Sequence, residues 1–218
     1  MHKTLKEKIQ ADFFFHQEVR KITGNKVFTK DRVFSADSIV IATPQSQAEK
    51  LLLHPSWKNL PLHSLHIAHV GFHKKVLPVQ GFGYLTSAQE NIPVLGAVFD
   101  SCMYPSSQEK IAFFLGGALY PKAQFFTDEK IKEVVQQALK EHLKIDDPPD
   151  VLVPVRGEKA SVILSPKREK WMQNLLRSLP KEYVLLGNYF SGVSVEHSIE
   201  RSISEVHRLT TSNSYFPN

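Results

Sequence analysis

The sequence has a single cysteine, Cys102, among its 218 residues. An internal disulfide is therefore excluded, and such low cysteine content is typical of proteins from reducing compartments. No histidine or basic partner for the thiol can be identified from the sequence, so we expect Cys102 to pack rather than to act as a nucleophile. These features favour a cytoplasmic protein.

Long hydrophobic runs are also missing. The longest quasi-apolar run, IAFFLGGALY at residues 111–120, is half the length of about 20 residues that a membrane-spanning helix needs. The N-terminal stretch MHKTLKEKIQ lacks the apolar core of a secretory signal. We therefore expect no membrane-spanning segment, although a peripheral contact with the inner face of a membrane stays open.

Two kinds of ligand site are missing from the sequence pattern. Gly81 and Gly83 resemble the start of a dinucleotide-binding GxGxxG fingerprint. However, no apolar strand precedes them and no third glycine follows. His63, His66 and His69 recur every three residues, yet a strand would place His66 on the face opposite the other two. No carboxylate or cysteine cluster completes a metal shell there, so we expect no metal site.

The composition is that of a globular protein. Hydrophobic residues make up 42% of the chain and charged residues 22%, enough to bury the core of one large or two small domains. The formal net charge is +5, and the basic residues are interleaved with acidic ones instead of forming a block. This does not indicate a nucleic-acid partner, and none is expected.

The order of the periodic segments predicts a mixed α/β and α+β fold. Strands such as LHIAHVGF, VLGAVFDS and IAFFLGGAL follow one another in the middle of the chain, which favours a mostly antiparallel sheet. Parallel-type pieces occur at both ends, around SIVIATP and VLLGN. We therefore predict that residues 45–156 form a domain inserted into another domain, made of residues 1–44 and 157–218. This outer domain has too few elements for a complete sheet.

The segment VLLGNYFSGVSVEHSIERSI, residues 184–203, predicts a strand, a glycine turn and a helix. Val195, Ile199 and Ile203 are spaced as one helical face, and Ser194 suits the N-cap position. Helix N-termini carry unpaired N–H groups and positive dipole, so the segment could hold an anion. An ordinary βα corner explains the same pattern.

Four motifs in series resemble one family. They are LPVQGFGYL at 77–85, VLGAVFDSCMYP at 94–105, FFLGG at 113–117 and LLGNYFSGVSVEHSIERS at 185–202. In this order and at these distances they resemble the C-terminal half of the protoporphyrinogen oxidases, within the flavin amine oxidase superfamily. The resemblance extends over nearly the whole chain, including VRKI and SIVIATP.

The resemblance implies an FAD-dependent oxidase that converts protoporphyrinogen IX to protoporphyrin IX with molecular oxygen during haem biosynthesis. By this resemblance residues 1–44 and 157–218 are the remnant of an FAD-binding domain, and residues 45–156 are the substrate domain. The positions that match FAD contacts of the family are Val19, Gly187, Asn188, Gly192, Val193, Ser194 and Val195. Those that match its tetrapyrrole contacts are Leu85, Val98 and Phe114. A plain sheet core explains the last three equally well.

The chain departs from the family in two ways. The Gly-rich Rossmann half that holds the FAD pyrophosphate is absent from these residues, and so is the arginine that the family uses for a propionate. A Pro-x-Tyr-Gly-His pattern is also missing from ASVILSPKREKW, which leaves no catalytic residue to name.

We therefore expect a C-terminal portion that is inactive alone and does not retain FAD, with the N-terminal half as partner and a tetrapyrrole as substrate. A cofactor-free tetrapyrrole-binding module and another flavin amine-oxidase-type enzyme are the alternatives.

Overall fold

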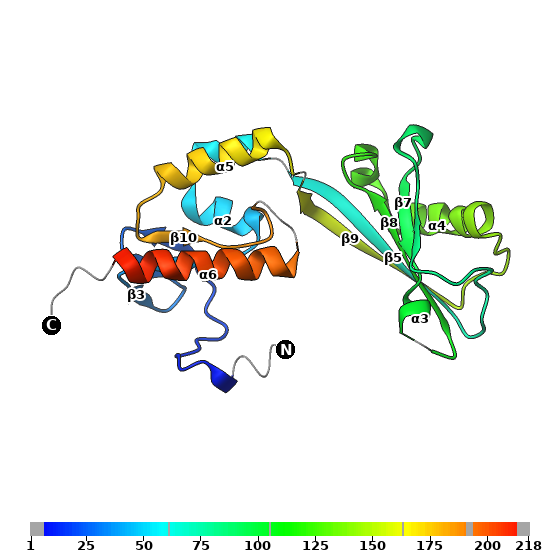
Figure 1. Ribbon diagram of the computed structural model, residues 1–218, viewed down its shortest axis with the longest axis horizontal. Coiled ribbons are helices and arrows are strands. Elements are labelled where there is room, and N and C mark those ends of the chain that lie inside the picture. The colour runs from blue at the N-terminus through cyan, green and yellow to red at the C-terminus, as the bar shows by residue number, and fades with distance from the viewer. Residues whose placement is uncertain (1–6, 61, 105, 163, 191–193, 213–218) are drawn as a thin grey trace. The chain divides into compact units, whose positions relative to one another are not determined.

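The computed structural model describes residues 7–60, 62–104, 106–162, 164–190 and 194–212. The chain forms two compact units, one of Met1–Asn59 with Glu169–Asn218 and one of Leu60–Arg168 (Figure 1). Both ends of the chain thus belong to the first unit. Among the described residues, no helix is both long enough and apolar enough to cross a lipid bilayer.

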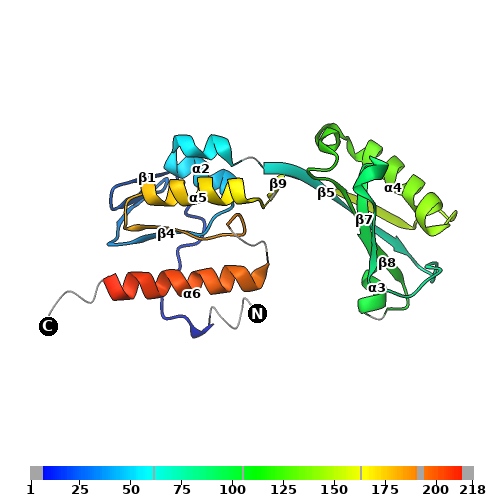
Figure 2. The ribbon, with the colours of Figure 1, turned by 45° about the horizontal axis from the view of Figure 1, so that its top comes forward.

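The first unit contains two small sheets and the helices that flank them. Strands β1 (Lys21–Thr23), β2 (Lys26–Phe28) and β3 (Val33–Ser35) form an antiparallel sheet. Strand β4 (Ile39–Ile41) pairs in parallel with β10 (Tyr183–Leu185), which joins the two ends of the chain. The β4–β10 pair lies between α6 (Val195–Ser212) on one side and α2 (Gln45–Leu52) with α5 (Pro166–Ser178) on the other (Figures 1 and 2). A short helix, η1 (Pro55–Asn59), completes this unit.

The second unit is built on a five-stranded antiparallel sheet in the order β6-β7-β8-β5-β9. The strands are β5 (Leu62–Phe72), β6 (Gly83–Leu85), β7 (Val94–Val98), β8 (Glu109–Gly116) and β9 (Val151–Val162). The helices are η2 (Ala88–Glu90), α3 (Asp100–Met103), η3 (Pro121–Phe125) and α4 (Asp128–Leu143).

One face of this sheet is closed by α4. The core joins side chains of β5, β7 and β8 to the apolar stripe of α4, with Val70, Phe113 and Leu139 among its buried members. Because side chains alternate along a strand, the residues between them, such as Ile67 and Phe114, point to the other face. Helix α4 packs on the closed face, and none of the described helices of this unit covers the second face in the two views (Figures 1 and 2).

Local sequence signals locate the helices well. Helix α2 begins directly after Pro44, and α4 follows Thr127, whose hydroxyl accepts the N–H of Lys130 as an N-cap. Helix α6 likewise begins after Ser194, whose hydroxyl accepts the N–H of His197.

The unit boundaries differ from the predicted ones at residues 44/45 and 156/157. Helix α2 packs with β1, so residues 45–59 belong to the first unit. Strand β9 continues past Arg156 and pairs Val162 with Leu62, so the second unit extends to Arg168. Neither the packing side of a helix nor the length of an edge strand can be read from residue periodicity alone.

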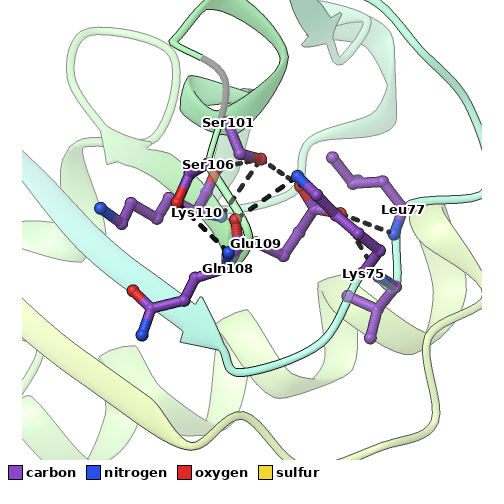
Figure 3. A network of polar contacts seen from close by, with 8 residues as sticks. Lys75, Leu77, Ser101, Ser106, Gln108, Glu109 and Lys110 are labelled. Atoms are coloured by element: carbon purple, nitrogen blue, oxygen red, sulfur yellow. Dashed lines mark hydrogen bonds and ion pairs between the residues drawn. The ribbon is translucent and has the colours of Figure 1, made fainter.

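Glu109, the first residue of β8, is the centre of a polar network (Figure 3). Its side chain is only 3% exposed. It accepts hydrogen bonds from the Ser101 hydroxyl and, at 3.3 Å each, from the backbone N–H groups of Val76 and Leu77. The Lys75 ammonium lies 3.4 Å away. One carboxylate thus ties α3 and the segment after β5 to the start of β8.

Two glycines allow β6 and β7 to approach closely. Gly83 and Gly96 have φ angles of +152° and +153°. A Cβ at Gly83 would lie 2.1 Å from the carbonyl oxygen of Ala97, and one at Gly96 would lie 2.3 Å from that of Tyr84. Side chains at these positions would push the two strands apart.

Glu109→Gln is expected to destabilise the chain by about 1–3 kcal/mol at neutral pH, because a buried charged acceptor is lost. Burial alone would raise the pKa of Glu109, but the Ser101 hydroxyl, the two N–H groups and Lys75 outweigh it and lower the pKa. The stabilisation is therefore present above the unfolded-state pKa of about 4.3 and is lost as pH falls through the lower folded-state pKa.

Chemical denaturation at several pH values measures this effect. The variant should show a shallower loss of stability on acidification than the wild type. Glu90→Gln, at an exposed position, is the matched control and should leave the curve unchanged. Identical curves for Glu109→Gln and wild type would show that the network contributes nothing.

Gly96→Ala is expected to lower the free energy of unfolding by about 1–3 kcal/mol, because its φ angle is strained for any residue with a Cβ. Gly81→Ala is the control, since no atom lies within 4 Å of a Cβ built there. Thermal or urea unfolding of both variants tests the difference. Equal midpoints would contradict the close approach of β6 and β7.

Candidate functional site

The open face of the five-stranded sheet carries an apolar cavity of about 590 Å³. Its lining comes from four strands and the segment just before β6. The lining residues are Leu65, Phe82, Tyr84, Leu85, Leu95, Ala97, Val98 and Phe114, of which Tyr84 and Ala97 turn their side chains to the closed face. The cavity can therefore receive a broad apolar group, and it offers almost no charge to a ligand.

The structure brings the three predicted substrate residues, Leu85, Val98 and Phe114, together in this cavity. Leu85 lies on β6, Val98 on β7 and Phe114 on β8, and these strands are neighbours in the sheet. Leu85 is 89% exposed, while Val98 and Phe114 are half-buried. A high exposed fraction at Leu85 argues against a plain core position. The role of these residues in substrate binding stays a prediction.

The sequence interpretation missed Leu65, Phe82 and Leu95. Phe82 lies inside the quoted LPVQGFGYL motif, but the motif alone does not tell which of its side chains face the cavity. Leu65 comes from β5, and only the pairing of β5 with β8 places it near Phe114.

Tyr84 anchors the short strand β6. Its hydroxyl lies 2.8 Å from Nδ1 of His142, near the end of α4, and the two rings meet edge to face at 5.5 Å. Burial raises the pKa of the Tyr84 phenol, so the hydroxyl stays protonated in the ordinary pH range. The contact holds β6, and with it Leu85, against the rest of the unit.

The predicted cofactor residues are spread over the first unit. Val19 is half-buried and precedes β1, while Gly187, Asn188, Ser194 and Val195 lie between β10 and the start of α6. Gly192 and Val193 fall outside the described residues.

Packing against the ring of Tyr189 requires a glycine at position 187. Its φ angle is +152°, and a Cβ would lie 2.3 Å from the ring of Tyr189. Tyr189 in turn stacks on Phe190 at 4.8 Å and meets Trp57 edge-on at 6.3 Å. The glycine is needed for this aromatic packing whether or not a ligand binds.

The start of α6 suits part of a flavin dinucleotide. Its first-turn N–H groups and dipole favour an electron-rich group, as expected for the edge of a flavin ring. However, Ser194 caps one of these N–H groups and Glu196 places a carboxylate in the first turn. The chain's own residues therefore fit the flavin edge better than a pyrophosphate.

Helix α6 turns its apolar residues outward, whereas a surface helix usually packs them against the core. Its apolar residues Val195, Ile199, Ile203 and Val206 are each more than half exposed. Most of the less exposed residues are polar. Arg201 donates from Nε to the carbonyl oxygen of Leu185 at 3.3 Å, and its guanidinium lies 3.9 Å from the centroid of the Phe190 ring. The helix thus attaches to β10 through polar contacts and presents an apolar stripe outward.

Comparison with known proteins gives sequence relatives. The sequence model of the family described as flavin containing amine oxidoreductase matches residues 1–209. The chain is 27% identical to the protoporphyrinogen oxidase of Bos taurus over 139 residues, which are 57% of this chain and 29% of the bovine protein. It is 30% identical to the protoporphyrinogen oxidase of Homo sapiens over 104 residues, 43% of this chain and 22% of the human protein.

Solved structures share the fold. A structure from Exiguobacterium sp. 255-15 matches with a TM-score of 0.79 at 15% identity, covering 90% of this chain and 47% of that chain. The cyclohexylamine oxidase of Brevibacterium oxydans IH-35A matches with a TM-score of 0.69 at 14% identity, covering 89% and 49%. The chain thus spans about half the length of these structures. With the family model matching nearly every residue, the chain belongs to the flavin containing amine oxidoreductase family.

Proposed function

We propose that this chain is the C-terminal portion of an FAD-dependent oxidase that converts protoporphyrinogen IX to protoporphyrin IX in haem biosynthesis. The observation that supports this most directly is the meeting of Leu85, Val98 and Phe114 on one apolar cavity wall. The mammalian relatives bear the name protoporphyrinogen oxidase.

The cavity wall has the chemistry that such a substrate needs. A porphyrinogen is a broad, largely apolar ring system, and its recognition requires flat apolar surfaces. Phe114 offers an aromatic ring, while Leu85 and Val98 offer aliphatic contacts from the neighbouring strands. These side chains would bind and orient the ring and exclude water from its surface.

The chain would contribute one side of the flavin site. FAD, when bound, would supply the hydride acceptor for the oxidation. Val19, Gly187, Asn188, Gly192, Val193, Ser194 and Val195 are the residues that we assign to it. The α6 start would place its positive dipole toward the flavin edge, which favours electron density there. No residue of the chain is assigned a proton-transfer role.

A second polypeptide segment would complete the flavin domain. The 218 residues contain no GxGxxG turn, and the outward apolar stripe of α6 offers a surface on which a Gly-rich α/β half would dock. We assign the N-terminal half of the enzyme to this surface. The reaction would take place in the cytoplasm, with peripheral contact at the inner face of a membrane.

Another amine-oxidase-type reaction is the second candidate. The fold is shared with cyclohexylamine oxidase, whose name indicates a small apolar ring bearing an amine. The charge-poor cavity would accept such a ring as well. The third candidate is a tetrapyrrole-binding module that holds no cofactor and uses the same apolar cavity.

Phe114→Ala is expected to weaken binding of protoporphyrin IX to the 218-residue chain by about two- to twelvefold, since ring stacking contributes about 0.5–1.5 kcal/mol beyond burial. Titration followed through porphyrin absorbance measures the dissociation constant, and denaturation of the same sample measures stability. The unfolding midpoint should change little.

Phe113→Ala is the matched control, because Phe113 is the neighbouring residue on the closed face and is fully buried. Its loss should cost about 3–5 kcal/mol of stability and leave the affinity of the folded fraction unchanged. If Phe114→Ala behaved in the same way, Phe114 would belong to the core and the substrate assignment would lose its support.

The isolated chain is expected to bind FAD weakly and to purify without colour, because the pyrophosphate would lack its main set of N–H donors. Absorbance of the supernatant after heat denaturation measures the flavin that was retained. Quenching of flavin fluorescence on titration gives the affinity. Stoichiometric yellow cofactor in the purified chain would refute the expectation.

A further inference from the structure

Strands β4 and β10 run in parallel, so their carboxyl ends lie at the same edge of the pair. Ile41 pairs with Leu185, and the N–H of Leu186 donates to the carbonyl oxygen of Ile41 at 2.9 Å. Thr43 and Gly187 each follow two residues after this pair, so both lie at the carboxyl edge. In open α/β sheets, ligands bind outside the carboxyl ends of the strands.

Thr43 has a buried hydroxyl at this edge. Its Oγ1 is shielded from solvent and forms no hydrogen bond within the described residues. The indole N–H of Trp57 is likewise buried and unbonded in the part of the chain that the structure describes, and its ring meets Tyr189, two residues after Gly187. A buried polar group without a partner is costly, because it gives up its hydrogen bonds to water. Two such donors near one segment point to polar contacts with a ligand.

The start of α2 gives Thr43 a favourable electrostatic environment. Pro44 occupies the N-cap position, and this described helix has neither a side-chain cap nor an acidic residue in its first turn. The start of α6, by contrast, is capped by Ser194 and carries Glu196. The positive end of the α2 dipole therefore lies next to Thr43 without a first-turn carboxylate to offset it, which favours an electron-rich ligand atom.

We propose that Thr43 is a further flavin-binding residue, whose hydroxyl donates a hydrogen bond to an acceptor atom of the riboflavin part of FAD. The inference rests on the flavin site proposed above and adds a side chain to it from the β4 side. A flavin ring carries carbonyl oxygens and unprotonated nitrogens, and its ribityl chain carries hydroxyls, so this part of FAD offers several acceptors. The SIVIATP segment thus contributes a ligand contact as well as a strand.

Riboflavin is the probe, because it has no pyrophosphate and does not need the GxGxxG turn that holds this group. The 218-residue chain is titrated into a fixed amount of riboflavin, and quenching of the flavin fluorescence gives the dissociation constant. Thr43→Val should weaken binding by about two- to tenfold, as expected for the loss of one hydrogen bond. Thr43→Ser keeps the hydroxyl and should bind as the wild type does.

Thermal unfolding of the ligand-free variants separates a ligand contact from a structural one. Thr43→Val removes a buried hydroxyl that has no partner among the described residues, so the midpoint should stay the same or rise. Thr29→Val is the matched control, because the Thr29 hydroxyl donates to Oε1 of Gln17 at 2.9 Å and accepts the N–H of Arg32 at 3.0 Å. Its loss should lower the midpoint by about 2–4 °C and leave the riboflavin affinity unchanged.

Three results would overturn the inference. Unchanged riboflavin affinity in Thr43→Val, with or without a lower midpoint, would do so and leave the flavin site at residues 187–195 in place. Weaker binding that Thr43→Ser does not restore would show that side-chain shape matters instead of the hydroxyl. If the wild type does not quench riboflavin fluorescence at any protein concentration, Thr43 has no such role in this chain. The porphyrin titration with Phe114→Ala then tests the proposed function independently.

Discussion

The alternation of side chains along β8 is the constraint on which the second unit depends. Phe113 is buried under α4, and Phe114, the next residue, lines the cavity on the opposite face. Because a strand has a period of two residues, a slip of one residue would exchange core and cavity. The register is held by the long pairing with β5 and by Glu109, which ties the first residue of β8 to α3. Core stability and the shape of the cavity are therefore set by the same contacts.

The first unit depends on the parallel pair of β4 and β10. Parallel strands are normally covered on both faces and occur in larger sheets, whereas this pair has two strands of three residues each. Val40 on β4 and the apolar stripe of α6 are both exposed. Exposed apolar patches of this kind are typical of interaction sites for proteins, membranes or ligands. The polar attachment of α6 through Arg201 explains how the helix stays in place while its apolar side faces outward.

Much of the local structure could be predicted from the sequence, because the signals are short-range. The bounds of α2, the Thr127 cap of α4 and the Ser194 cap of α6 each rest on residues a few positions apart. The motif series also placed Leu85, Val98 and Phe114 as one group, and they share one cavity. The boundaries between the units could not be predicted, since they depend on how far β9 continues along β5.

Long-range contacts account for what the sequence interpretation missed in the site. The spacing of Val195, Ile199 and Ile203 predicts one apolar helical face, but nothing in that spacing tells which side of α6 meets β10. Likewise, the hydrogen bond between Tyr84 and His142 joins β6 to the last turn of α4, and no local pattern links them. Periodicity defines a face of an element, and only packing shows whether that face is covered.

Alternation along β5 separates residues of the same type between the two faces of the sheet. His66 and His69 illustrate how the sheet arranges this: His66 is buried on the closed face, bonded to the carbonyl oxygen of Ala123 at 2.8 Å, while His69 faces the open side. The same alternation separates core from surface along the whole of β5, so that residues two positions apart share one environment and direct neighbours do not.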